Sequence, residues 1–165
     1  MPVAFFVMTT MLDAFDRRFA ALHTRSISLL EKITSDQLFL KPRETKNSMA
    51  MFSCGEFILR SAAAVEQTSG GITTRLWDDP FEWTLPEKLS TVDLVIEYLD
   101  EVEETRQGAF RFIDSDESLD KQIQAPEKLR TIFDLLLETV ARAEHYQGRA
   151  FAIAQMLSDE KLPRI

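Results

Sequence analysis

The sequence predicts an all-α fold, an antiparallel four-helix bundle. Four long segments repeat apolar residues at steps of three and four, which is the spacing of one helix face. No segment alternates with the period of a β-strand, and Gly and Pro number only 5 and 6 in 165 residues. Helices that each carry one apolar face bury those faces together in a bundle. We expect a single domain over residues 1–165, with its core from about residue 8 to 160.

The first predicted helix runs from about Met8 to Ile33. The charged residues 16–18 lie off its apolar stripe, so one face is left for the core. The stripe consists of Met8, Leu12, Phe15, Phe19, Leu22, Leu29 and Ile33.

The second predicted helix begins at the segment "SCGE", residues 53–56. This segment has the form of a capping box, in which Ser53 accepts from the Glu56 amide and the Glu56 side chain reaches back. The helix continues through "FILRSAAAVEQT", and we expect Gly70 and Gly71 to end it.

The connection at 72–89 is rich in aromatic residues. Three exposed aromatic side chains in one loop would form an adhesive patch, so we expect this segment to pack across the end of the bundle. The aromatic residues expected to be at least partly buried are Trp77, Phe81 and Trp83.

The third and fourth helices are predicted from two further starts. The segment "STVD", residues 90–93, begins the third helix, and the acidic segment at 114–120 follows it as a predicted solvated loop. The segment "TIFD", residues 131–134, begins the last helix, which continues to about Leu157. The stripe of the third helix is Val92, Val95, Leu99, Val102 and Phe110.

Charge and composition exclude several classes of partner. The formal net charge of −8 and the pI near 4.8 disfavour a general nucleic-acid binder, which needs a concentrated basic face. The apolar segment at 2–8 is too short to span a membrane. Cys54 is the single cysteine, so no intrachain disulfide forms, and we expect a buried side chain rather than a nucleophile. We therefore expect a cytoplasmic protein with neither nucleic acid nor membrane as partner.

Three segments resemble the DinB-like family. They are "ETVARAEHYQGRAFAIAQML" in the last helix, "SCGEFILRSAAAVEQ" in the second, and "LLEKITSDQLFLKPRE" after the first. The resemblance covers about residues 8 to 160 and implies a four-helix bundle that is often dimeric. Many members hold a divalent metal through three histidines. Their relatives include thiol-dependent S-transferases and a mycothiol-dependent maleylpyruvate isomerase.

The chain departs from this family at the metal ligands. With Gly148 as the anchor, the three positions carry Arg60, Arg142 and Tyr146, none of which is histidine. A guanidinium has no free lone pair and repels a cation, so we expect no metal and no cofactor. Helical periodicity directs Tyr146 to the core and Arg142 to its flank, and it turns His145 about 130° away, to the surface.

Arg60, Arg142 and Tyr146 together form a candidate binding site. Two guanidinium groups beside a phenol suit a carboxylate, phosphate or sulfonate. Alternatively, both arginines are paired within the helices, because Glu56 and Glu138 each stand four residues before them.

Gly148 lies on a second strip of the last helix. Glycine costs about 1 kcal/mol in a helix interior, so we expect a neighbouring helix to approach it closely, from the same bundle or from a second subunit. The family resemblance favours a homodimer, with the surface around Gly148 and Phe151 as the candidate contact and the first helix as an alternative. The other residues of the strip are Phe133, Leu137 and Ala141.

Three hypotheses on function follow. The first is a metal-free protein that binds a small anionic ligand or has lost catalysis. The second is a metal- and thiol-dependent S-transferase or isomerase with an unrecognised metal site. The third is a dimeric structural or stress-associated interaction protein.

Overall fold

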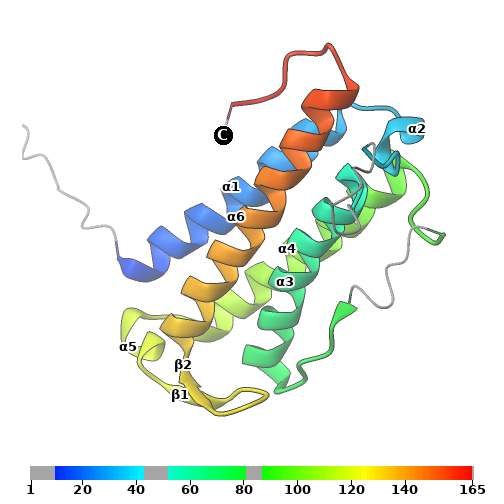
Figure 1. The fold of residues 1–165 in the computed structure, drawn as a ribbon. Coiled ribbons are helices and arrows are strands. Elements are labelled where there is room, and N and C mark those ends of the chain that lie inside the picture. The colour runs from blue at the N-terminus through cyan, green and yellow to red at the C-terminus, as the bar shows by residue number, and fades with distance from the viewer. Residues whose placement is uncertain (1–9, 43–51, 81–86, 165) are drawn as a thin grey trace, which may run out of the picture.

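Four long helices form the bundle in the computed structural model, which describes residues 10–42, 52–80 and 87–164. They are α1 (Met11–Leu30), α3 (Cys54–Thr74), α4 (Val92–Ile113) and α6 (Ile132–Leu157), and the short α2 (Ser35–Leu38) follows α1. α3 packs antiparallel to α6, and α1 packs antiparallel to α4. The connection after α3 returns the chain, so that α4 runs in the same direction as α3 (Figure 1). The predicted all-α four-helix fold is confirmed.

Hydroxyl side chains cap the long helices at their starts. Ser53 Oγ accepts from the Glu56 amide at 3.2 Å, and Glu56 Oε2 accepts from the Ser53 amide at 2.7 Å, so the predicted capping box is confirmed. The Glu56 carboxylate is thereby engaged at the start of α3. Thr91 and Thr131 cap α4 and α6 within the segments where the sequence predicts those helices to begin.

The prediction for the end of α3 is wrong. The helix continues past Gly70 and Gly71 to Thr74, and Arg75 ends it in the left-handed conformation with φ of 64°. Gly71 serves packing instead, because a Cβ at this position would overlap the indole ring of Trp77. Gly71 is thus explained by the close approach of a ring, which sequence alone does not distinguish from a helix stop.

The acidic segment at 114–120 is not the solvated loop that the sequence predicts. It forms the short helix α5 (Asp116–Leu119), in which Leu119 is buried. The Asp116 carboxylate accepts from the amides of Met11 and Leu12 at 3.0 and 2.8 Å and so caps the start of α1. The predicted start of the first helix at Met8 lies outside the described residues.

A short hairpin precedes α6, which the sequence does not predict. β1 (Gln122–Gln124) pairs antiparallel with β2 (Leu129–Thr131), and strands of three residues are too short to show alternation. Trp77 is partly buried as expected, and its indole N–H donates to the Gln124 carbonyl at 3.1 Å. Trp77 thereby joins the end of α3 to the hairpin, whereas Phe81 and Trp83 lie outside the described residues.

Within the described residues, the predicted apolar stripes of the helices face one core, and α6 also buries polar side chains there, of which Gln147 is the least exposed. Gln147 is 2% exposed, and its amide donates to the Leu22 carbonyl at 2.7 Å and to Ser26 Oγ at 2.8 Å. These bonds tie α6 to α1 and satisfy an amide that would otherwise be costly to bury. None of the helices in the described ranges is long and apolar enough to cross a membrane.

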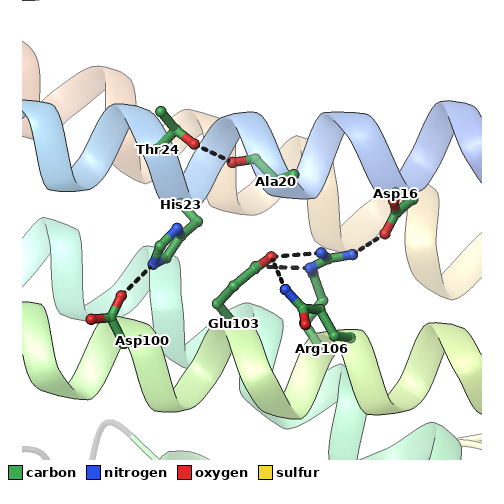
Figure 2. Close-up of polar contacts among 8 residues, drawn as sticks. Asp16, Ala20, His23, Thr24, Asp100, Glu103 and Arg106 are labelled. Carbon is green, nitrogen blue, oxygen red and sulfur yellow. Dashed lines mark hydrogen bonds and ion pairs between the residues drawn. The ribbon is translucent and has the colours of Figure 1, made fainter.

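A charged residue completes the stripe of α4. Arg106 lies between Val102 and Phe110 and is 2% exposed. Its Nη1 donates to Asp16 Oδ1 on α1 at 2.5 Å, while its Nε and Nη2 donate to the two oxygens of Glu103 at 2.9 and 2.6 Å (Figure 2). Two carboxylates therefore neutralise and orient this buried guanidinium between α1 and α4.

Candidate functional site

The three residues that the sequence predicts as a site lie around one small cavity between α3 and α6. Its volume is about 60 Å³. The structure therefore brings together Arg60, Arg142 and Tyr146, the three residues that the family resemblance aligns with one site. The other lining residues are Ala63, Ala64, Gln67 and Asp79.

Aromatic rings hold two of the three residues in place. Tyr146 stacks on Phe57, with ring centroids 6.3 Å apart and an interplanar angle of 28°. The Arg60 guanidinium lies over the Phe52 ring, 4.1 Å from its centroid, and Phe52 meets Phe57 edge-on. The phenol and the guanidinium are thus positioned by ring contacts at the start of α3.

Arg142 has one long hydrogen-bond contact among the described residues. Its Nη2 lies 3.4 Å from Gln67 Oε1, and its Nε is buried without a hydrogen-bond partner among the described residues. The predicted pair of Arg142 with Glu138 is wrong, because Glu138 forms its ion pair with Arg130 instead. Arg130, at the end of the hairpin, forms ion pairs with Asp134 and Glu138 in the first turns of α6.

A second and larger cavity lies on the other side of Arg142. Its volume is about 300 Å³, which is at the lower end of the range for small-molecule pockets. Arg142 and Gln67 line both cavities, so they form the wall between them. The larger cavity is completed by Trp77, by the hairpin residues 125–128 and Arg130, and by Thr68, Leu135, Glu138 and Thr139.

The small cavity does not suit a divalent metal. Two of its side chains are guanidinium groups, which repel a dication, and Asp79 supplies the one carboxylate among the described lining residues. Among the residues that the structure describes, no group of three or more His, Cys, Asp and Glu side chains converges as a metal site.

The two histidines lie apart from this cavity. His145 is exposed, as predicted. His23 Nε2 lies 2.9 Å from Asp100 Oδ1, on the α1–α4 side of the bundle (Figure 2). Cys54 is 1% exposed, and burial raises the pKa of its thiol to about 12, so the prediction of a buried cysteine is confirmed.

The sequence predicts that a neighbouring helix approaches Gly148 closely, and within the bundle this prediction is wrong. A Cβ at this position would meet no other described residue within 4 Å. Phe151 of the same strip is only 4% exposed and belongs to the core, whereas Leu137 is 49% exposed. Phe151 is therefore not available as the contact between subunits that the sequence suggests.

Gln67 and Trp77 belong to the site, although the sequence does not predict them there. Gln67 Nε2 donates to the Trp77 carbonyl at 2.9 Å, which turns its Oε1 toward Arg142. The spacing of Gln67 from Arg60, seven residues on one helix, places both on the same face and is the only signal that points to it.

The sequence matches no protein-family model and no curated protein. Two solved structures are similar in fold. The DinB-like protein YjoA of Bacillus subtilis is 18% identical, with a TM-score of 0.67 over 92% of this chain and 96% of that chain. A DinB-like protein of Bacillus cereus is 12% identical, with a TM-score of 0.72 over 96% of this chain and 99% of that one. The chain therefore has a DinB-like fold.

Proposed function

We propose that this protein binds a small anionic ligand without a metal, and that Arg142 holds the anion. The observation that carries the proposal is the state of the Arg142 side chain. Its Nε is buried without a hydrogen-bond partner in the described part of the chain, and its Nη2 has only a long contact to Gln67. A buried polar group without a partner is uncommon in a folded protein and costs about 1–3 kcal/mol.

An anion would supply the hydrogen-bond acceptor that the Arg142 Nε lacks among the described residues. A carboxylate or phosphate oxygen accepts from Nε and Nη2 together, in the two-pronged arrangement that guanidinium groups favour. Arg60 and Tyr146 border the same small cavity, so they add positive charge and a hydroxyl donor on one side of the bound oxygen atoms. Asp79 partly offsets this charge, which favours an anion of low charge.

We propose in addition that the family's metal site is lost in this chain. The positions that the resemblance aligns with metal ligands carry two arginines and a tyrosine. A positive charge 4 Å from a metal repels each unit of metal charge by about 4 kcal/mol at an effective dielectric of 20. Elemental analysis of the purified protein should find no stoichiometric zinc, nickel or iron. One such ion per chain that is lost on Tyr146→Phe would contradict this.

Calorimetric titration with acetate and with inorganic phosphate tests the anion proposal. Arg142→Gln should weaken binding of the better anion by about tenfold or more, because it removes the charged donors. Arg149→Gln is the matched control, since Arg149 lies on the same helix but is exposed and lines neither cavity. Equal affinity in the two variants, or no binding of either anion by the unchanged protein, would overturn the proposal.

We also propose a homodimer, with the outer face of α6 around Leu137 and Gly148 as the contact. Leu137 is 49% exposed, and Gly148 leaves open space beside the helix. Light scattering at micromolar concentration should give twice the chain mass of 18.9 kDa. A monomer would contradict the proposal.

A further inference from the structure

We infer that the anion bound by Arg142 is the carboxylate of a small aromatic acid, whose ring lies in the larger cavity against Trp77. This inference rests on the proposed function, and it names the class of ligand and the cavity that holds it.

Trp77 is fixed as a wall of the larger cavity by contacts on three sides. Its ring packs against Gly71, its indole N–H donates to the Gln124 carbonyl at 3.1 Å, and its own carbonyl accepts from Gln67 at 2.9 Å. The indole donor is therefore already used, so Trp77 presents ring surface to the cavity. A flat apolar group that stacks on this surface is the complementary ligand part.

The charges around the larger cavity leave Arg142 as its inner anion-binding group. The Arg130 guanidinium is held by the carboxylates of Asp134 and Glu138. Glu127 and Lys128 are both exposed and opposite in charge, so they balance each other at the outer end. A ligand with its carboxylate on Arg142 and its ring toward Trp77 matches this arrangement.

The size of the cavity supports the same class. A volume of about 300 Å³ exceeds what acetate or phosphate would fill, and it suits a single ring with one carboxylate. Gln67 connects the two ends of the site, because its amide contacts both the Trp77 carbonyl and Arg142. Because the contact from Gln67 is to the backbone carbonyl of Trp77, a change of the Trp77 ring leaves the link to Arg142 in place.

Calorimetric titrations with benzoate, acetate and benzamide test the inference. Benzoate should bind at least about tenfold more tightly than acetate, because only benzoate reaches Trp77. Benzamide has the same shape without the charge and should not bind measurably. Trp77→Leu should remove the advantage of benzoate over acetate, and Tyr146→Phe, which alters only the small cavity, should keep that advantage. Retained acetate binding by Trp77→Leu shows that this variant is folded.

A fluorescence titration gives a second readout that leaves Trp77 unchanged. The chain has two tryptophans, so Trp83→Phe makes Trp77 the single reporter. Benzoate should change the emission of Trp77 with the dissociation constant found by calorimetry, and acetate should change it much less.

Equal affinities for benzoate and acetate that both depend on Arg142 would overturn this inference and leave the proposed function standing. No binding of any anion would overturn both. A benzoate advantage lost in Tyr146→Phe but kept in Trp77→Leu would place the ring in the small cavity and overturn the inference.

Discussion

Arg106 and Arg142 show how differently one bundle treats two arginines. Arg106, between α1 and α4, is 2% exposed and donates to the carboxylates of Asp16 and Glu103. Arg142, between α3 and α6, has a buried Nε with no partner in the described residues and one contact of 3.4 Å to Gln67. The α1–α4 side supplies carboxylates for its arginine, whereas the arginine on the α3–α6 side borders two cavities.

The difference separates a structural arginine from one that is available to a ligand. Arg106 has its charge neutralised inside the chain, so a further anion would gain little from it and would meet two carboxylates. Arg142 borders two cavities and has donor capacity left over. The same residue type, buried at Arg106 and partly buried at Arg142, therefore carries opposite expectations for stability and for binding.

The largest expected effect is on the paired arginine. Arg106→Met should lower the free energy of unfolding by about 3 kcal/mol, because it leaves Glu103 and Asp16 without their partner and one of them mostly buried. Arg142→Met should change it by less than about 1 kcal/mol, since it removes an unsatisfied donor. Urea unfolding of both variants measures the two values. Equal losses would show that the contrast between the two arginines is false.

The pH dependence of stability should follow the protonation of the Glu103 carboxylate. Burial raises the pKa of Glu103, but the hydrogen bonds from Arg106 and Gln107 outweigh burial and hold this pKa below its ordinary value of 4.5. The carboxylate therefore stabilises the fold above the ordinary pKa, and this contribution is lost as the pH falls through the lowered one.

Glu103→Gln should accordingly lower the free energy of unfolding by about 2 kcal/mol at neutral pH, through the loss of a charged hydrogen-bond acceptor. The variant and the unchanged protein should become equally stable at acid pH. Glu101→Gln, at an exposed position of the same helix, is the control and should shift the whole profile only slightly. A loss of the same size at every pH would contradict the role of the Glu103 charge.

Near the proposed ligand site, Gly71 is expected to affect stability and binding because it packs against the Trp77 ring. Gly71→Ala forces the indole ring to move, which costs about 1–3 kcal/mol, but it also gains about 0.5–1 kcal/mol of helix propensity. The net loss in the free energy of unfolding should be about 1 kcal/mol, and benzoate binding should weaken with it. Undiminished stability and binding would mean that Trp77 does not depend on Gly71.

The sequence predicts the helices well because their determinants are local. Apolar spacing and the capping box at Ser53 need only neighbouring residues, and both are confirmed. The errors concern residues whose partners are distant along the chain. The sequence predicts a helix stop at Gly71, which instead accommodates Trp77, and a loop at Asp116, which instead caps α1.

The candidate site also has a part that the sequence predicts and a part that depends on residues distant along the chain. The family resemblance aligns Arg60, Arg142 and Tyr146 with one site, and they line one cavity because helix geometry fixes where each side chain lies. The larger cavity depends on the hairpin and on Trp77, which pack onto α3 and α6 from segments without a clear period. Whether Glu138 pairs with Arg142 or Arg130 is a competition that spacing along one helix cannot resolve.

The smallest expected effect is a gain in stability at Gly148. Gly148→Ala replaces a residue in a helix interior where a Cβ meets no other described residue within 4 Å, so the free energy of unfolding should rise by about 0.5–1 kcal/mol. The same substitution at Gly71 should lower the free energy of unfolding, which makes the two variants a matched pair on different helices.

The gain at Gly148 should be independent of protein concentration if the surface around Gly148 faces solvent. If the proposed dimer closes on Gly148, the alanine should instead weaken the dimer, and light scattering should then detect a higher fraction of monomer at low concentration. Urea unfolding at two protein concentrations separates these results, because only the loss of a contact between subunits makes the midpoint fall further on dilution.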